Sequence, residues 1–340
     1  MPRVDAFAHT LPPVHADASR VLRTTVGLRP YRPGGFVIRA ETLGQKTLIH
    51  DYGHGGSGVS LSWGTAAMSL ELLDDGPLEN AAVIGCGVVG LATARLLQKR
   101  GIAVTIYAAE KPPKTTTDLS GAFWAPFSLV DENRMTPEIA ERIVKAGRIA
   151  YAEFEQMTNQ TRYAIRRLPT YYLDDRPAEV TPEERLMPDL FSGESLRPGE
   201  HPFGNRYALV VPALAIEPSP HIRAVLEDFE QAGGQFVRRE FKERDDIASL
   251  SERVVFNCSG LGSRVLANDG ELIPMKGQLT LLQPQPEINY MLAVPKKRLY
   301  MIPRSDAIVL GTSQVRNNWS LEPDKAETAR VLAGLAALRK

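Results

Sequence analysis

The residues best suited to chemistry in this sequence form a glycine-rich turn, Gly85-Cys86-Gly87-Val88-Val89-Gly90. Its glycine spacing is the one that a bound pyrophosphate requires. Gly85 permits a tight turn, Gly87 lets the backbone approach the phosphates, and Gly90 lets the next helix pack on the preceding strand. The anion would lie on the free amides at the helix N-terminus. The predicted cofactor contacts in this turn are Gly85, Gly87, Val88, Val89 and Gly90.

The segments around this turn supply the elements that a dinucleotide fold needs. An apolar run from Ala81 leads into the turn, a helical stretch follows, and a second apolar run, 103–108, ends before Ala109 and Glu110. Glu110 lies about 20 residues after the last glycine, where a carboxylate can accept a hydrogen bond from a ribose 2'-hydroxyl. A 2'-phosphate would be repelled there, so FAD or NAD is favoured over NADP. The competing interpretation is a buried turn without a cofactor.

A second strand, glycine turn and helix precede the first set. Residues 34–40 and 47–51 have the pattern of strands, 52–58 form a glycine-rich turn, and 59–73 have helical apolar spacing. This arrangement again places backbone amides at the start of a helix, which makes it a second candidate contact to the same cofactor. The predicted contacts are Gly55, Gly56, Gly58, Val59 and Ser60. His54 stands in this turn, and we interpret it as structural because the glycines around it suggest backbone contacts.

Two arginines, Arg29 and Arg32, are interleaved with prolines that stiffen the backbone. A rigid loop holding guanidinium groups suits a planar carboxylate, because Arg can donate two parallel hydrogen bonds to it. Two ordinary surface arginines are the competing interpretation. Further along, the polar loop 111–118 contains Thr115, Thr116 and Thr117, whose hydroxyls can reach a pyrophosphate or a ribityl chain. A solvated polar turn would explain that loop equally well.

Composition narrows the class of protein. The 340 residues suggest about two domains, and 40 basic residues balance 40 acidic ones, so we expect no nucleic-acid partner. No apolar stretch has the length of a signal peptide or of a membrane helix, which predicts a soluble, cytoplasmic protein. Cys86 and Cys258 follow apolar runs, and we expect buried free thiols rather than a disulfide or a metal pair. No metal-ligand spacing and no local Ser/His/Asp or Cys/His pattern is present.

The rest of the chain alternates helical and strand-like segments. We predict helices over 137–157, 220–233 and 321–338, strands over 163–173, 236–240 and 254–257, an antiparallel sheet over 275–312, and a long surface excursion over 176–202. The fold class is therefore α/β, with a second domain that contains its own sheet.

Several segments resemble the D-amino-acid oxidase family of flavoproteins. LRTTVGLRPYRPGGFVIRAE and HDYGHGGSGVSLSWGTA are similar to that family's carboxy-terminal segments. AAVIGCGVVGLATA and KTTTDLSGAFWAPF are similar to its amino-terminal ones, and VVFNCSGLGSRVLA, PMKGQLTLL and LYMIPRSDAIVLGTSQVRNNWSL to its middle ones. Nearly the whole chain is covered, but the family's tail stands first, joined through 73–80 to the family's first strand. This order is the pattern of a circular permutation, which is tolerated where the old termini lie close together.

The resemblance implies a Rossmann-like FAD-binding domain and an α+β substrate domain with an antiparallel sheet, circularly permuted. The FAD-binding domain would be assembled from 35–125 and 215–270, and the substrate domain from 126–214 and 271–340, with 20–34 reaching the substrate pocket. It implies FAD as the cofactor and further contacts at Thr115, Thr116, Thr117, Gly121, Ala122, Phe123, Ser259 and Gly260. Residues 120–126 would pass under the flavin ring, with Trp124 closing a wall.

The implied activity is oxidative deamination of a D-amino acid. Arg29 and Tyr300 would bind the substrate carboxylate, the carbonyl of Gly56 would accept from the amino group, and the α-hydrogen would pass as hydride to flavin N5. The imino acid would leave and hydrolyse, and dioxygen would reoxidise the flavin to give hydrogen peroxide. The family's lid-borne tyrosine has no match, because residues 296–298 are Lys-Lys-Arg in a shorter lid. These charges could favour acidic D-amino acids, but neutral ones remain the primary expectation.

Three other functions remain open. A flavin-dependent D-amino-acid dehydrogenase would use a non-oxygen acceptor, an oxidase of another small amine would take glycine or sarcosine, and a non-enzyme would bind FAD as an inactive scaffold. Retention of Arg29 and Tyr300 argues against the scaffold. A homo-oligomer is compatible with the sequence, which does not fix the oligomeric state.

Overall fold

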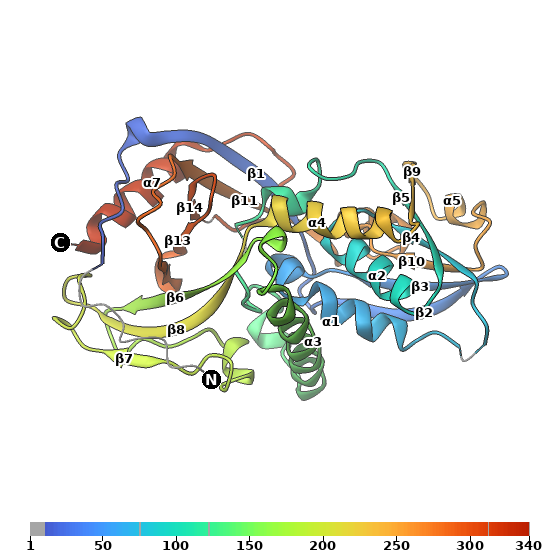
Figure 1. The fold of residues 1–340 in the computed structure, drawn as a ribbon, viewed down its shortest axis with the longest axis horizontal. Coiled ribbons are helices and arrows are strands. Elements are labelled where there is room, and N and C mark those ends of the chain that lie inside the picture. Colours follow the sequence, from blue (N-terminus) through green and yellow to red (C-terminus); the bar gives the residue numbers. More distant parts are fainter. Residues whose placement is uncertain (1–10, 75, 122, 312, 340) are drawn as a thin grey trace.

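The computed structural model describes residues 11–74, 76–121, 123–311 and 313–339, and within them two sheets lie side by side (Figure 1). The first sheet has the strand order β2-β3-β10-β4-β5-β9. Its strands are β2 (Val37–Leu43), β3 (Lys46–Tyr52), β4 (Asn80–Ile84), β5 (Ala103–Ala108), β9 (Gln235–Arg238) and β10 (Val254–Asn257). All neighbours pair in parallel except β2 and β3. Residues 81–84 of β4 are all buried, as expected of a central parallel strand covered on both faces.

Three helices pack together beside this sheet. They are α1 (Gly58–Leu70), α2 (Val88–Lys99) and α3 (Pro137–Met157), and α4 (Pro218–Gln231) covers α2. Helix α1 crosses α3 so closely that a Cβ at Gly64 would lie 1.8 Å from the carbonyl oxygen of Ala146. Thr136 caps α3 by accepting from the Ile139 amide at 3.3 Å. Two one-turn helices, α5 (Asp245–Ala248) and α6 (Ser263–Leu266), flank β10 in the sequence.

The second sheet forms the other half of the molecule. Its order is β1-β11-β14-β13-β12-β6-β8-β7, with β15 also paired to β11. The strands are β1 (Val21–Tyr31), β6 (Ile165–Asp174), β7 (Glu194–Leu196), β8 (Tyr207–Ile216), β11 (Ile273–Leu282), β12 (Met291–Val294), β13 (Leu299–Pro303), β14 (Ile308–Gly311) and β15 (Val315–Arg316). Helix α7 (Lys325–Ala336) packs on β11, β13 and β14.

The structure corrects three details of the sequence interpretation. Residues 26–33 were expected to form a rigid loop, but 26–31 belong to the edge strand β1, where Pro30 is tolerated because an edge strand leaves one side without hydrogen-bond partners. The segment 176–202 is not a bare excursion, since it contains the short strand β7. The strands within 275–312 pair antiparallel as predicted, but β12 pairs in parallel with β6, so the whole sheet is mixed.

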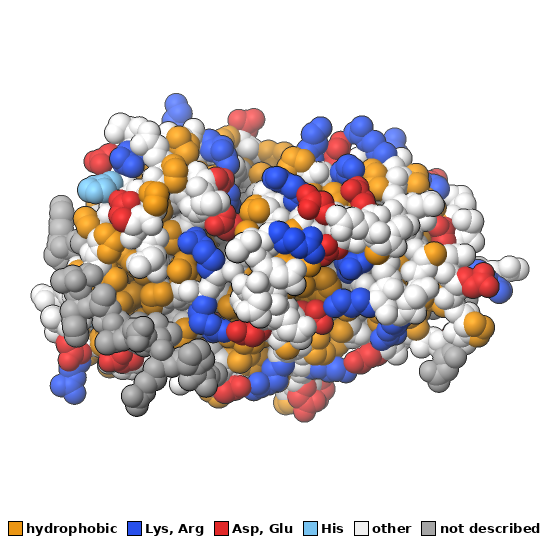
Figure 2. All heavy atoms as spheres, in the orientation of Figure 1, with side chains coloured by type: hydrophobic (Ala, Val, Ile, Leu, Met, Phe, Trp, Pro, Cys, Tyr) orange, Lys and Arg blue, Asp and Glu red, His pale blue; other side chains and the backbone are white. Residues whose placement is uncertain are grey.

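The visible surface carries charges of both signs. Figure 2 shows Lys and Arg interspersed with Asp and Glu on this face. Among the described residues, no helix is long and apolar enough to cross a membrane. The described residues also contain no group of three or more His, Cys, Asp or Glu that could hold a metal ion.

Candidate active site

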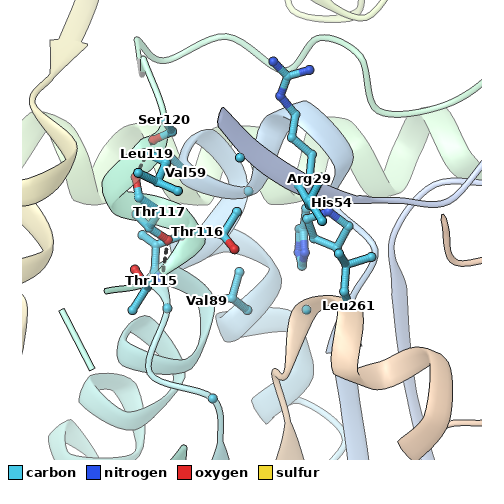
Figure 3. Close-up of a pocket in the computed structure, with 18 of the residues that line it drawn as sticks. Arg29, His54, Val59, Val89, Thr115, Thr116, Thr117, Leu119, Ser120 and Leu261 are labelled. Carbon is cyan, nitrogen blue, oxygen red and sulfur yellow. Dashed lines mark hydrogen bonds between the residues drawn. The ribbon is translucent and has the colours of Figure 1, made fainter. Parts of the chain in front are cut away.

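A cavity of about 540 Å³ is lined by residues of both sheets. In Figure 3, Thr115, Thr116, Thr117, Leu119 and Ser120 stand on one side, Arg29, His54 and Leu261 on the other, and Val89 lies between them. The cavity therefore has a glycine-lined part at the parallel sheet and a second part at β1, β11 and β13. The lining includes Gly27, Arg29, Asp51, His54, Gly55, Gly56, Gly58, Val59, Ser60, Gly85, Cys86, Gly87, Val88, Val89, Ala109, Glu110, Thr115, Thr116, Thr117, Gly121, Phe123, Arg239, Phe241, Ser259, Gly260, Gly277, Leu279 and Tyr300.

The turn between β4 and α2 has the geometry that its glycines suggested. Gly85 has φ +110°, and a Cβ there would lie 2.4 Å from the carbonyl oxygen of Cys258. A side chain at this position would therefore be strained and would clash with the end of β10. Gly90 does not line the cavity. A Cβ on Gly90 would lie 2.0 Å from the carbonyl oxygen of Gly85, so its contribution is the packing of α2 under the turn.

The first turn of α2 meets the threonine loop. The Val88 amide donates to the Thr117 hydroxyl at 3.2 Å, so a hydroxyl already stands where the helix presents its free amides. Thr115 donates from its own hydroxyl to Asp118 Oδ2 at 2.7 Å, and its amide donates to the same oxygen. These two bonds fix the loop internally, the bond from Val88 to Thr117 holds it against the helix N-terminus, and all three threonines line the cavity.

Glu110 lines the cavity beyond β5, but it has a partner that sequence reasoning missed. Arg238 donates to Glu110 Oε1 at 2.6 Å and to the Ala109 carbonyl at 3.0 Å. Arg239, Glu240 and Phe241 follow and line the same end. Their position at the end of β9, beside β5 in the sheet, was the available signal, because residues at the carboxyl ends of adjacent parallel strands share one edge.

The second glycine turn is fixed by the segment 123–128. The Gly56 amide donates to the Ser128 carbonyl at 3.1 Å, and Ser57 Oγ donates to the Phe127 carbonyl at 2.7 Å. The Ser60 hydroxyl lies 3.0 Å from both the amide and the carbonyl oxygen of Ala125. The start of α1 is therefore immobilised by internal bonds, and Gly55, Gly58 and Val59 complete the wall.

His54 and Asp51 form a buried polar pair at this turn. His54 Nε2 is 2.9 Å from Thr65 Oγ1 and 3.2 Å from Asp51 Oδ1, and its ring stacks on Phe36. These contacts agree with the structural interpretation of His54, although its ring also lines the cavity. Both cysteines are free and buried, and burial raises the pKa of the Cys86 thiol to about 12.

Arg29 lies in the second part of the cavity, where its guanidinium crosses β11. Both terminal nitrogens are within 3.4 Å of the Ser313 carbonyl oxygen, and a Cβ on Gly277 would lie 2.2 Å from Nη2. Burial lowers the pKa of Arg29, and the neighbouring Tyr300 partly offsets this effect. A cation held with so little water interacts strongly with an incoming carboxylate. Arg32 points elsewhere, to Asp269 and Glu271.

Tyr300 is packed between two glycines. A Cβ on Gly311 would lie 2.4 Å from Tyr300 Cζ, and one on Gly121 would lie 2.8 Å from its hydroxyl oxygen. Gly277 and Gly311 thus provide the space for the two side chains expected to bind a carboxylate. Sequence reasoning missed both glycines. The one available indication was that each lies within a strand, where a glycine often marks a place that another group approaches closely.

The cavity also has apolar surface. Leu119, Phe127, Leu279 and Ile302 contribute aliphatic and aromatic surface. Trp124, expected to close a wall at the flavin ring, is not among the described lining residues, and its ring stacks on Phe191. The Lys-Lys-Arg segment is also absent from the described lining, and Lys296 pairs with Asp174 at 2.7 Å.

The cavity brings together nearly all the residues singled out in the sequence. Arg29, Tyr300, Gly56 and the glycine, valine and threonine positions named above line one space, as do Ser60, Ala109, Glu110, Phe123, Ser259 and Gly260. Gly90 lies behind the turn, and Ala122 lies outside the described residues. Segments as far apart as 29, 121 and 300 therefore meet at one site.

A family model described as FAD dependent oxidoreductase matches residues 80–339. The chain belongs to this family. FAD is its cofactor, and it is an oxidoreductase that resembles the D-amino-acid oxidases. A D-amino-acid oxidase of Rubrobacter xylanophilus is 32% identical over 263 residues, covering 76% of each chain. A D-amino acid oxidase of Dugesia ryukyuensis is 30% identical, covering 74% of this chain and 75% of the relative. The human D-aspartate oxidase is 25% identical over 266 residues.

Solved structures confirm the fold class. Glycine oxidase from Geobacillus kaustophilus superposes with a TM-score of 0.57 at 16% identity, covering 77% of this chain and 78% of that one. L-proline dehydrogenase from P. horikoshii gives 0.57 at 15% identity, covering 77% of each chain.

The residues present fit FAD. The close approach at Gly85, the first amides of α2 beside a threonine hydroxyl, and Glu110 at the end of β5 match a pyrophosphate and a ribose. The start of α1 offers a second set of backbone groups in the same cavity. The two sets together can contact both ends of a dinucleotide.

Proposed function

We propose that this chain oxidatively deaminates D-amino acids and uses dioxygen as its electron acceptor. The observation that carries the proposal is the position of Arg29, a buried guanidinium in the same cavity as the glycine turns that fit FAD. When bound, FAD supplies the redox chemistry, taking a hydride at N5 and passing electrons to dioxygen to give hydrogen peroxide.

The protein's own residues would bind and orient the substrate. Arg29 would donate two parallel hydrogen bonds to the carboxylate, and the Tyr300 hydroxyl would donate a third. The Gly56 carbonyl would accept from the amino group. With both ends of the amino acid held, the α-hydrogen is directed toward the cofactor, which converts binding energy into orientation.

The lining near Arg29 favours neutral D-amino acids. Leu119, Phe123, Phe127, Leu279 and Ile302 line the cavity and can accept an apolar side chain, whereas a second charged group loses water when it is buried against such surface. The exposed segment 296–298 would act on acidic substrates only through long-range attraction, which salt screens.

Anaerobic spectroscopy of the purified flavoprotein tests the proposal. We expect D-alanine and larger neutral D-amino acids to bleach the flavin, while the L-isomers and glycine leave it oxidised or reduce it far more slowly. In air, the same substrates should consume dioxygen and form peroxide. Bleaching without oxygen consumption would indicate a dehydrogenase. Preference for glycine or sarcosine would indicate a different amine, and no bleaching by any of them would refute the proposal.

We also propose the two-domain division and the circular permutation. The family match begins at residue 80, whereas β2, β3 and α1 precede it and still form part of the parallel sheet and its helical layer. In an unpermuted chain, α7 would be followed in the sequence by β1, so the two segments should lie close together. The hydroxyls of Thr24 in β1 and Thr328 in α7 are 3.5 Å apart. The connection between α1 and β4 runs mainly over exposed residues, as a later join would.

A further inference from the structure

Three polar side chains meet at the end of β1, and we call Tyr31, Asp131 and Arg316 the Tyr31 clamp. The Tyr31 hydroxyl donates to Asp131 Oδ1 at 2.5 Å, and Arg316 donates to both Asp131 oxygens at 2.5 and 3.1 Å. The Arg316 guanidinium also lies 4.6 Å from the centre of the Tyr31 ring. Burial raises the pKa of Tyr31, and Arg316 lowers that of Asp131, so the phenol stays a donor to a carboxylate.

Arg316 belongs to the segment that holds Arg29. Its strand β15 pairs with β11 at Met275, and Met275 pairs on its other side with Arg29. Ser313, just before β15, accepts from the Arg29 guanidinium through its carbonyl and from the Gln278 amide through its hydroxyl. The position of this segment therefore sets where the guanidinium lies.

Asp131 belongs to the segment that holds the second glycine turn. The carbonyls of Phe127 and Ser128 accept from Ser57 Oγ and from the Gly56 amide. The Asp131 amide in turn donates to the Pro33 carbonyl at 2.9 Å.

Tyr31 completes the connection. It forms an isolated β-bridge with His54, and its ring packs on the same turn, since a Cβ on Gly55 would lie 2.9 Å from Tyr31 Cδ2. One three-residue cluster thus joins β1, the segment 127–131 and the segment 313–316.

We propose that the Tyr31 clamp is a positioning device that fixes the separation between the Arg29 guanidinium and the Gly56 carbonyl. This inference rests on the proposed function, in which these two groups hold the two ends of one amino acid. A small error in their separation would tilt the α-hydrogen away from the cofactor, and misplacement by about 1 Å can cost about 100-fold in rate. None of the three clamp residues lines the cavity, so they act through Arg29 and Gly56.

Two of the three clamp side chains are partly exposed, so we expect their substitution to leave the fold intact. The Arg316 and Asp131 side chains are 51% and 22% exposed, and ion pairs with such exposure contribute little to stability. Arg134 provides a matched control, because it follows Asp131 closely but pairs with the exposed Glu271 instead. Tyr31→Phe provides the mildest variant, since it removes only the hydroxyl from a buried ring.

The experiment compares Arg316→Ala, Arg316→Lys, Asp131→Asn, Tyr31→Phe and Arg134→Ala as FAD-loaded proteins. Anaerobic stopped-flow with D-alanine gives the limiting rate of flavin reduction and the apparent Kd. We expect Arg316→Ala and Asp131→Asn to lower the limiting rate by roughly 10- to 100-fold with FAD retained. Arg316→Lys and Tyr31→Phe should lie between them and the parent, and Arg134→Ala should match the parent.

Two outcomes would overturn the inference. One is a limiting rate and Kd within twofold of the parent for Arg316→Ala and Asp131→Asn. The other is loss of FAD by every clamp variant, Tyr31→Phe included, which would make the cluster a requirement of the fold. If D-amino acids fail to reduce even the parent flavin, the proposed function fails. The clamp is then judged by titration with benzoate, a planar carboxylate, which should still bind more weakly to Arg316→Ala than to Arg134→Ala.

Discussion

Replacing Arg29 by Ala tests the central assignment. The side chain is held by the Ser313 carbonyl across Gly277, in a setting that lowers its pKa through loss of water. Removing one partner of a desolvated charged pair costs roughly 2 to 5 kcal/mol. At about 1.4 kcal/mol for each factor of ten, kcat/KM for a D-amino acid should fall by roughly 30- to 5,000-fold. Because the same contact orients the substrate, KM should rise and flavin reduction should slow together.

The protein itself should tolerate this change. Burying the Arg29 cation destabilises the folded protein, because the guanidinium loses water. Removing it also removes this penalty, so FAD should stay bound and Tm should change little. Arg29→Lys should fall between Ala and the parent, because an ammonium group cannot form the two parallel bonds. Slow oxidation of an amine without a carboxylate should be unaffected.

Arg32 supplies the matched control for this experiment. It is three residues away, but its guanidinium is held by Asp269 and Glu271 and does not line the cavity. Stopped-flow reduction and steady-state kinetics with D-alanine should therefore separate Arg29→Ala from Arg32→Ala. If Arg29→Ala keeps the parent's KM and reduction rate, the carboxylate is bound elsewhere and the assignment is wrong.

Four further outcomes are expected. Gly277→Ala should displace the Arg29 guanidinium and raise KM, while the released cofactor remains FAD by chromatography. Gly85→Ala should instead weaken FAD binding, measured by flavin fluorescence, because its Cβ would meet the Cys258 carbonyl. Inserting Gly-Ser pairs within 73–80 should cost about 0.6 kcal/mol per doubling of loop length and leave FAD bound, and loss of flavin would contradict the proposed join. His221 is buried and its pKa falls from 6.5 to about 4. The unfolded chain therefore binds its proton first, and stability should drop by about 3 kcal/mol as the pH falls from 6.5 to 4. Urea titrations of the parent and of His221→Gln should differ in that window.

Local sequence determined the parts of the site that a few adjacent residues build. The glycine turn at 85–90 and the glycine-rich turn at 52–58 were predicted as turns before a helix, and helices α2 and α1 do follow them. The threonine loop contains a short 3-10 helix that was not predicted, and residues of all three segments line one cavity. Helix α3 begins and ends where its pattern predicted, because Thr136 caps it and its apolar face repeats at helical spacing. The carboxylate-binding roles of Arg29 and Tyr300 came from resemblance and stay predictions.

Tertiary structure decided what depends on contacts between distant segments. Pairing with β11 turned the expected arginine loop into an edge strand, and Arg238 reached Glu110 across the sheet. The space around Arg29 comes from Gly277, almost 250 residues away. The Tyr31 clamp likewise joins residues 31, 131 and 316. Local patterning could not predict these contacts, because helix and strand propensities depend only on neighbouring residues in the sequence. The space around a side chain and its ion-pair partners depend instead on which distant segments the fold brings beside it.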